Sequence, residues 1–384
     1  MNGAGVYVHL PFCVTRCAYC DFAIHLTTDA AVQARYYDAV LREWALRDPG
    51  PGPIVSIYFG GGTPSLAPPA AIARIIAAVT ERVAVAVDAE VTLEANPGTV
   101  SDATLDGYRR AGVNRLSIGV QAAESRILQA MNRPHDFSQA VAAVAGARAA
   151  GIDNVNLDAM YGYPGQTLTD VERTVQALVE LEPEHLSLYQ LQLEKGTVLR
   201  REVSRGRAVM PDEDLTADMA ERAAQIAEAA GLHRYEVSNF ARPGRASRHN
   251  RLYWNQAPYV GLGMGAHSFD GRRRAWNVRS LSGYLARLEA GQLPELGGED
   301  LSRDELMSEF VWLGLRQVDG IAAADFRRRF GVTLESRFGA VMESLSRAGL
   351  IAAECGRLFL SARGFEVMNQ ILPEFLPDSA EALS

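Results

Sequence analysis

Short apolar runs alternate with longer stretches of helical periodicity along the first half of this 384-residue chain. The short runs favour strands because they are rich in β-branched and aromatic residues. Six strands are predicted, at residues 6–9, 54–59, 90–94, 115–118, 154–158 and 185–191, with helices between them at 30–46, 70–79, 101–111, 138–150 and 169–181. Such alternation indicates an α/β fold with parallel strands and crossover helices. Six units are typical of a partial (β/α)6 barrel, whereas a complete TIM barrel has eight.

The pattern changes near residues 294–304, where glycines and acidic residues predict a linker. Helical runs follow at 305–316, 321–330 and 334–348, and a hairpin is predicted at 350–353 and 357–360. Three helices and a hairpin resemble a winged helix, which we interpret as a packing or partner module rather than a DNA-binding one. The predicted organisation is a core barrel over 1–234, a connecting segment over 235–295 and a small α+β domain over 296–384. The acidic tail, 373–384, is expected to fray.

Composition limits the classes of function. Apolar residues make up 48% and charged residues 22% of the chain, enough for a packed core, and the net charge of −8 argues against a general nucleic-acid surface. Charged residues interrupt the most apolar helical stretch, 70–91, so no bilayer span is predicted. The first residues lack the basic start and apolar core of a signal peptide. We therefore expect a cytoplasmic protein, with peripheral membrane contact left open.

Three of the four cysteines, Cys13, Cys17 and Cys20, stand in the spacing C-x3-C-x2-C. Three thiolates in one loop can hold three irons of a [4Fe–4S] cube and leave the fourth iron open to a small molecule. A structural zinc site normally takes four protein ligands, so that alternative needs His9 or His25 as well. A disulfide framework is not expected from so few cysteines.

Polar residues gather where the predicted strands end, and active sites of barrels form at the carboxyl ends of the strands. Gly60, Gly61 and Gly62 follow the second strand and are expected to let the backbone approach a ligand closely. Glu94 ends the third strand and Asp158 the fifth, and either could accept hydrogen bonds from ribose hydroxyls or an amine. Further candidates in this group are Thr63, Gln121, Tyr189, Gln190 and Gln192.

Together these motifs resemble the coproporphyrinogen dehydrogenase-like branch of the radical S-adenosylmethionine (SAM) superfamily. The matching segments are YVHLPFC, GGGTP, EANP, GVQ, NLDAMYGYPGQ and LYQL, and they extend over nearly the whole chain. The resemblance implies a [4Fe–4S] cluster on the three cysteines and SAM at the open iron. Tyr19 would pack on the SAM adenine or the cluster, and Arg133 would pair with the SAM carboxylate, although on its own it reads as a solvated surface arginine. The implied SAM contacts are Tyr7, Tyr19, Gly61, Gly62, Thr63, Glu94, Gln121, Arg133 and Asp158.

Two functions occur within this branch: oxygen-independent coproporphyrinogen III dehydrogenases decarboxylate two propionates, whereas HemW-type chaperones bind heme and pass it to acceptor proteins. The dehydrogenase pattern has a fourth cysteine two places after the third, where this chain has Phe22. Only twelve residues precede Cys13, fewer than in the dehydrogenases. Both departures favour the chaperone and leave open whether this chain is an enzyme and whether it cleaves SAM.

A segment near residue 250 resembles the H-N-x-x-Y-W motif of HemW-type proteins and is formed by His249, Asn250, Tyr253 and Trp254. An imidazole is a common axial ligand of heme iron, and the aromatic rings offer flat apolar faces. The nearby arginines could pair with heme propionates; they are Arg242, Arg245, Arg248 and Arg251. The alternative is a solvated basic loop with a buried aromatic anchor. His267 is a second candidate ligand, for which a hydrogen-bonded structural role is the alternative.

The resemblance also implies partners. Heme is the expected ligand and a heme-acceptor protein the expected partner, with a respiratory, membrane-associated acceptor and a homodimer as further expectations. Nucleic acid is not expected.

Overall fold

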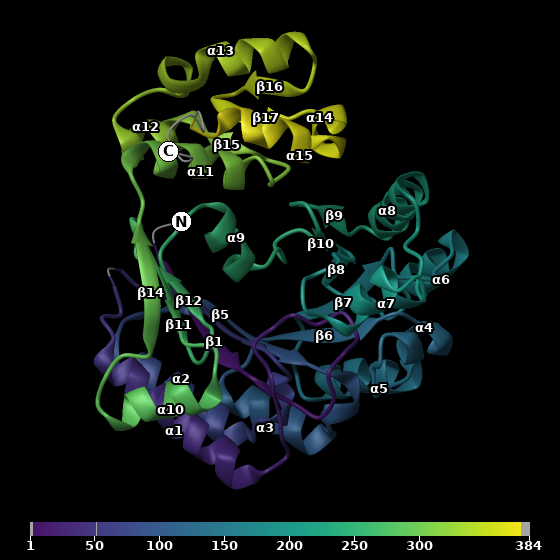
Figure 1. Cartoon of the computed structure of the whole chain (residues 1–384), viewed down its shortest axis with the longest axis vertical. Coiled ribbons are helices and arrows are strands. Elements are labelled where there is room, and N and C mark those ends of the chain that lie inside the picture. Colours follow the sequence, from purple (N-terminus) through teal and green to yellow (C-terminus); the bar gives the residue numbers. More distant parts are fainter. Residues whose placement is uncertain (1–2, 51, 378–384) are drawn as a thin grey trace.

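A computed structural model describes residues 3–50 and 52–377 of the chain. Its main feature is an open sheet in the order β14-β13-β12-β11-β1-β4-β5-β6-β7-β8-β10-β9 (Figure 1). The six predicted strands form its centre: β1 (Ala4–Leu10), β4 (Ile54–Gly61), β5 (Val85–Ala95), β6 (Arg115–Gln121), β7 (Val155–Tyr161) and β8 (His185–Gln190). Neighbours among these six pair in parallel, as expected for a partial barrel.

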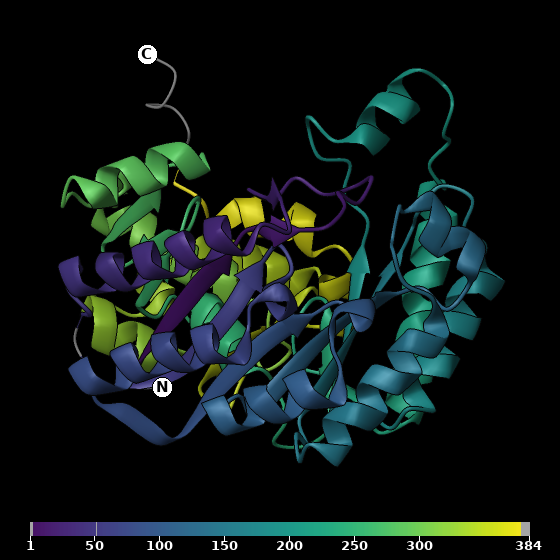
Figure 2. The same cartoon turned by 90° about the horizontal axis from the view of Figure 1, so that it is seen from below.

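Most of the helices that follow these strands lie along the outer side of the sheet (Figure 2), whereas the short helix at Val198–Ser204 lies beside the cysteine loop, where the Leu199 amide donates to the Ala18 carbonyl. The helices are α1 (Ala30–Leu46), α2 (Pro69–Arg82), α3 (Asp102–Ala111), α4 (Ser125–Ala130), α5 (Phe137–Ala149), α6 (Leu168–Val179), α7 (Val198–Ser204) and α8 (Glu213–Ala229), with short 3-10 turns η1 (Pro64–Leu66) and η2 (Pro97–Thr99). Local chemistry sets their starts: the Asp29 side chain accepts from two backbone amides at the start of α1, and Thr167 forms a capping box with Asp170 at α6. The apolar face of these helices and strands builds the main core.

The sheet continues beyond the six expected strands. β11 (Tyr259–Leu262) pairs in parallel with β1, and β12 (His267–Phe269), β13 (Arg273–Asn277) and β14 (Glu295–Asp300) extend it with antiparallel pairing. Residues 294–304 were expected to be a linker, so that expectation was wrong: six of them form the edge strand β14. At the other edge lie β10 (Asn239–Ala241) and β9 (His233–Arg234).

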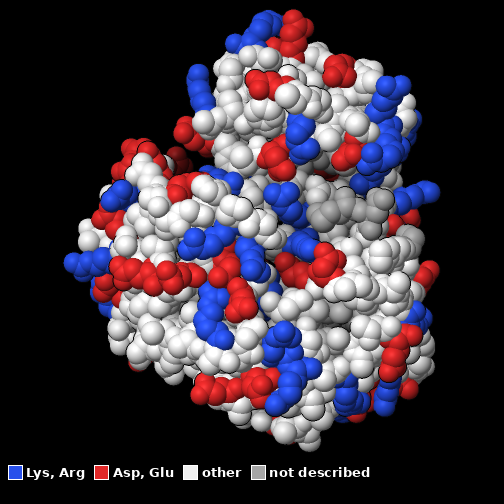
Figure 3. All heavy atoms as spheres, turned by 180° about the vertical axis from the view of Figure 1, so that it is seen from behind, with Lys and Arg blue, Asp and Glu red and all other residues white. Residues whose placement is uncertain are grey.

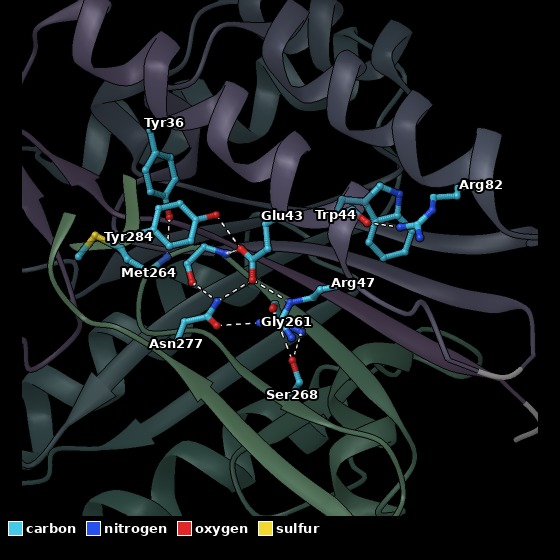
Figure 4. A network of polar contacts seen from close by, with 11 residues as sticks. Tyr36, Glu43, Trp44, Arg47, Arg82, Gly261, Met264, Ser268, Asn277 and Tyr284 are labelled. Carbon is cyan, nitrogen blue, oxygen red and sulfur yellow. Dashed lines mark hydrogen bonds and ion pairs between the residues drawn. The ribbon is translucent and has the colours of Figure 1, made fainter. Parts of the chain in front are cut away.

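A buried polar network attaches this extension to α1 (Figure 4). The Glu43 carboxylate, which is 0% exposed, accepts hydrogen bonds from Arg47 Nε (2.8 Å), Asn277 Nδ2 (2.8 Å), the Gly263 amide (2.8 Å) and the Tyr284 hydroxyl (2.6 Å). Arg47 also donates to Asn277 Oδ1 at 2.7 Å. Tyr284 belongs to α10 (Leu281–Glu289), so one side chain connects α1, β13, α10 and the loop after β11.

The C-terminal module has the predicted winged-helix-like composition. It contains α11 (Arg303–Gly314), α12 (Ala323–Phe330), α13 (Leu334–Arg347), α14 (Ala362–Glu366), α15 (Met368–Ile371), η3 (Leu372–Phe375) and a sheet of β15 (Ile321–Ala322), β17 (Arg357–Leu360) and β16 (Ile351–Glu354). Its separate core includes Phe326, Phe338 and Phe375. Part of the predicted fraying tail is therefore packed, because Phe375 is 0% exposed, while residues 378–384 lie outside the described part.

The module adjoins the end of the barrel where the strands begin. α9 (Arg248–Trp254) contacts β1 and β4 on one side and α11 on the other, and Arg274 on β13 forms an ion pair with Glu309 on α11. On the face seen from behind, basic and acidic side chains are intermixed (Figure 3). No helix within residues 3–50 and 52–377 has the length and apolar character needed to cross a bilayer.

Candidate functional site

The three clustered cysteines lie in one loop above the barrel, between two very short strands. β2 (Phe12–Cys13) pairs in parallel with β3 (His25–Leu26), which closes the loop at its base. Cys13 is buried and its Sγ lies 3.4 Å from Thr63 Oγ1, while Arg133 Nη1 donates to Cys17 Sγ at 3.4 Å. Cys355, by contrast, is exposed between β16 and β17 in the C-terminal module.

Burial makes the Cys13 and Cys20 thiols poor acids in the absence of a metal. Desolvation raises the pKa of Cys13, and desolvation with the neighbouring sulfurs raises that of Cys20 to about 11. Iron binding would therefore release protons from the loop. In the described ranges, no three His, Cys, Asp or Glu side chains converge as a single-ion site requires. A cubane differs because it takes one sulfur on each of three irons, so the donor set fits the cluster.

The zinc alternative needs a fourth ligand that the structure does not offer at His9. This side chain is 5% exposed, its Nε2 lies 2.8 Å from the Ala23 carbonyl oxygen, and its Nδ1 lies 3.1 Å from the Tyr7 hydroxyl. The His25 ring lies edge-on to the Phe12 ring, with 6.4 Å between the ring centroids.

A cavity of about 380 Å³ opens directly beside the cysteine loop. All three cysteines line it, together with residues from the carboxyl ends of β4, β5, β6, β7 and β8. Eight of the nine expected SAM contacts are in its wall: Tyr19, Gly61, Gly62, Thr63, Glu94, Gln121, Arg133 and Asp158. The ninth, Tyr7, is not among the lining residues and lies behind Gly60, where its ring packs against Tyr58 with centroids 6.1 Å apart.

The two carboxylates of the cavity are held by neighbouring donors. Glu94 accepts from the Tyr58 hydroxyl at 2.8 Å and from the Gly61 amide at 3.1 Å, and burial raises its pKa to about 7. Asp158 accepts from Asn156 Nδ2 at 2.6 Å, and burial raises its pKa as well. Near neutral pH, a bound cationic group would favour the ionised form of both acids.

The strand-end glycines are required by protein contacts rather than by a ligand alone. A Cβ on Gly61, whose φ is +112°, would lie 2.5 Å from the His9 ring, and one on Gly62 would lie 2.6 Å from the Pro11 carbonyl carbon. The expectation that these glycines allow close approach of a ligand stays a prediction; within the protein, the groups that approach them are His9 near the end of β1 and Pro11 just after it. Gly61 and Gly62 still form part of the cavity wall.

Arg133 is not the solvated surface residue that its sequence context suggested. Its Nη2 donates to the Gly119 carbonyl at 2.5 Å while Nη1 contacts Cys17, which holds the guanidinium between the cysteine loop and β6. Gln121 lies beside it at a bulge in β6, with φ +72°. Both side chains therefore face the cavity from the same strand end.

The His249 segment lies at the opposite end of the barrel. α9 begins after Ser247, and the Glu90 carboxylate accepts from the Ser247 hydroxyl and from the backbone amides of Arg248 and His249. Asn250 is half-buried, and its backbone amide donates to the Ser247 hydroxyl at 3.3 Å. None of these residues lines the cavity.

His249 has no free ring nitrogen. It is 1% exposed, its Nδ1 lies 2.8 Å from Ser56 Oγ, and its Nε2 lies 2.8 Å from the Tyr253 hydroxyl. Burial lowers its pKa to about 3, so the imidazole is neutral. Ligation of heme iron would require breaking one of these bonds and opening the barrel end. In this conformation His249 is a packing residue of the barrel floor, contrary to our expectation of an available ligand.

The other members of the expected heme segment are also engaged by protein. Tyr253 packs edge-on against Tyr259, with 4.7 Å between ring centroids, and Trp254 is half-buried, with no hydrogen-bond partner for its Nε1 among the described residues. Of the four arginines, three contact protein groups: Arg242 the Pro183 carbonyl, Arg248 the Asp88 carboxylate and Arg251 the Asp319 carboxylate.

Sequence reasoning missed a buried arginine between these two ends. Arg115 starts β6 and is 2% exposed, and its side chain forms no ion pair or hydrogen bond with another described residue, with the buried Nε left without a partner. Ser117, two residues along the same face, lies 3.4 Å from an Asp158 oxygen and pairs in register with Glu94. The Arg115 charge lowers the pKa of Glu94 and Asp158 on one side and that of His249 on the other. An arginine at a strand start carries no sequence signal of this kind.

Comparison with known proteins agrees with this geometry. The Radical SAM superfamily model matches residues 7–178, and the HemN C-terminal domain model matches residues 301–367. Among curated relatives, "Heme chaperone HemW" of Synechocystis sp. is 39% identical over 329 residues, covering 83% of this chain and 79% of that protein. "Heme chaperone HemW" of Mycobacterium tuberculosis is 38% identical over 364 residues, covering 94% and 91%.

A solved structure shows the same fold over almost the whole chain. Coproporphyrinogen III oxidase (HemN) from Escherichia coli, a radical SAM enzyme, superposes with a TM-score of 0.83 at 23% identity and covers 97% of this chain and 90% of that one. The family match agrees with both the fold and the cysteine-lined cavity. The identity to curated relatives shows that the chain belongs to the HemW family of the radical SAM superfamily.

Proposed function

We propose that this protein is a heme chaperone, which binds heme and transfers it to acceptor proteins. The observation that carries the proposal is the identity of 38–39% to curated heme chaperones, which extends over 94% of this chain in the Mycobacterium tuberculosis relative. The proposed acceptor is a heme protein, with a respiratory, membrane-associated protein as the finer proposal. Association of two copies is part of the same proposal.

The proposal includes a [4Fe–4S] cluster and SAM beside the cavity. Cys13, Cys17 and Cys20 would hold the cluster, and the lining carboxylates with Arg133 would bind the polar groups of SAM. When bound, these groups supply one-electron chemistry, whereas the chain's own residues position SAM and exclude water. Anaerobic reconstitution with iron and sulfide tests the ligand set. A Cys13→Ser variant should lose the bound iron, and Cys355→Ser should retain it because this thiol is remote and exposed.

The alternative is coproporphyrinogen III decarboxylation, with which the similarity of fold to HemN is compatible. At 23% identity this similarity shows the fold alone, and Phe22 occupies the place of the fourth cysteine expected in dehydrogenases.

One reconstituted preparation can decide between the two. Hemin titration followed at the Soret band and an anaerobic assay with coproporphyrinogen III, SAM and a reductant are carried out in parallel. Heme binding without decarboxylation, followed by heme transfer to apomyoglobin as an acceptor, is the expected result. Turnover of coproporphyrinogen III without heme binding would replace the chaperone by the enzyme.

A further inference from the structure

One histidine in the sheet extension has the exposure that His249 lacks. His267 is the first residue of β12, its side chain is exposed, and no described residue hydrogen-bonds to its ring. Partial burial lowers the pKa of His267, and the neighbouring Arg279 and Arg274 lower it further, so the imidazole is neutral near pH 7. A neutral imidazole with a free nitrogen is the form that binds metals.

An aromatic surface lies beside this imidazole. Trp276 on β13 pairs in register with His267, and their ring centroids are 6.1 Å apart. The next strand contributes Gly297, and a Cβ there would lie 3.0–3.2 Å from atoms of the indole. The glycine therefore allows the Trp276 ring to lie across β14, and the indole remains half-buried. The result is a flat apolar patch next to a free ring nitrogen.

This patch lies on the inner face of the sheet extension, at the same end of the strands as the cysteine loop. Asn277, the neighbour of Trp276, contacts Glu43 on α1, so the alternate residues His267 and Trp276 face away from the helices. A Cβ at Gly265 would lie 3.0 Å from Ala23 Cβ. The exposed Arg279 donates to the Asp21 carbonyl at 3.1 Å, so its guanidinium is held beside the cysteine loop.

The available histidines are few. Both ring nitrogens of His9, His185 and His249 have hydrogen-bond partners, whereas His135 and His233 each have a partner on one ring nitrogen among the described residues. His135 is buried, and the exposed His233 holds the Glu228 carboxylate through its Nδ1. Only His25 and His267 lack a partner on both ring nitrogens among the described residues, and the His25 ring packs against the buried Phe12 ring instead of beside an open aromatic surface. Among the described histidines, only His267 combines an exposed side chain, an adjacent indole and the nearby guanidinium of Arg279.

We propose that His267 is the axial ligand of bound heme, with Trp276 in contact with the porphyrin and Arg279 paired with a propionate. Imidazole ligation, an aromatic contact and a guanidinium–carboxylate pair are the interactions that heme requires. This inference rests on the proposed function and gives the heme site a location distinct from the His249 segment. The His249 segment then serves to close the barrel floor.

Hemin titration of the full-length, cluster-reconstituted protein tests the assignment. His267→Ala should weaken binding at least about tenfold and abolish the magnetic circular dichroism signature of histidine ligation. Added imidazole should restore that signature in His267→Gly, an effect that a purely structural role would not produce. His25→Ala is the matched control, because it removes the other imidazole without a partner, and it should bind hemin like the wild type.

The outcomes distinguish failure of the proposed function from failure of the proposed heme site. If the wild-type protein does not bind hemin, the proposed function fails and the site fails with it. If the wild type binds hemin and His267→Ala binds it with unchanged affinity and spectrum, the site is wrong while the function stands. Loss of the histidine signature in His25→Ala, or in a folded His249→Ala variant, with His267→Ala unaffected, would move the ligand to that residue and likewise overturn the assignment.

Discussion

Replacement of Glu43 by alanine should release the sheet extension from the barrel. The carboxylate is fully buried and accepts four hydrogen bonds, of which those from Arg47 and Asn277 reach one oxygen and those from Gly263 and Tyr284 reach the other. Removing one partner of a buried ion pair costs about 3–5 kcal/mol because the other charge stays buried without compensation. Arg47 keeps one bond, to Asn277 Oδ1, so we expect a loss of about 4 kcal/mol in the free energy of unfolding.

An exposed ion pair between α1 and α10, the two helices that Glu43 connects through Tyr284, provides the control. Arg35 on α1 and Glu289 on α10 form an ion pair with side chains that are 60% and 43% exposed. Exposed pairs contribute at most about 1 kcal/mol, so Glu289→Ala should have a small effect. The comparison keeps the helices and the type of charge constant and changes the burial.

Urea unfolding followed by circular dichroism measures the two free energies, and hydrogen exchange locates the change. The Glu43→Ala variant should exchange faster in β11, β12 and β13, whereas the amides of β6 and β7 should be unaffected. Equal losses for Glu43→Ala and Glu289→Ala, or faster exchange spread over the whole sheet, would refute the reasoning.

Three further predictions concern the cavity. Because burial raises the pKa of Glu94 to about 7, its carboxylate is protonated below that pH, and SAM affinity of the reconstituted protein should rise about tenfold from pH 6 to pH 8 in calorimetric titrations; a flat profile would contradict this. Arg115→Gln removes a buried cation that favours the ionised acid, so the midpoint of that profile should move up by about one pH unit, and an unchanged midpoint would exclude the role. Gly61→Ala should cost about 3 kcal/mol in thermal or urea unfolding, because its φ is +112° and the added Cβ would lie 2.5 Å from the His9 ring. Gly165→Ala, at φ +80° with nothing within 4 Å of the added Cβ, should cost about 1 kcal/mol, and similar losses at both positions would disprove the steric argument.

The central barrel could be predicted because its signals are local and repeated. Each buried parallel strand contains a short apolar run, and most of the long helices between them start at a capping side chain, so the six strands and the five long helices between them follow from the pattern. The outer strands lack these signals. β12 has three residues, and β14 has the sequence ELGGED, which reads as a linker because its strand conformation comes from pairing with β13.

In the candidate site, too, some features could be predicted from the sequence and others could not. Cysteine spacing and position after a strand predict which residues meet at the carboxyl end of a barrel, and eight of the expected SAM contacts do line one cavity there. Burial is a property of the whole fold and does not appear in a motif. The sequence therefore suggested an available His249, whereas Ser56 and Tyr253, from a distant strand and the next helical turn, occupy its nitrogens.

The margins of the open sheet affect how two copies could meet. Unpaired edge strands invite pairing with another chain, and natural sheets often prevent it with charges or with very short edges. Here one margin is β14, which carries Glu295, Glu299 and Asp300, and the other is β9, which has only two residues. Pairing of two β14 strands would bring like charges together, and β9 is too short to pair stably with a strand of another chain. Self-association, and by the same logic fibrous aggregation, is thus directed away from the sheet borders and toward side-chain surfaces.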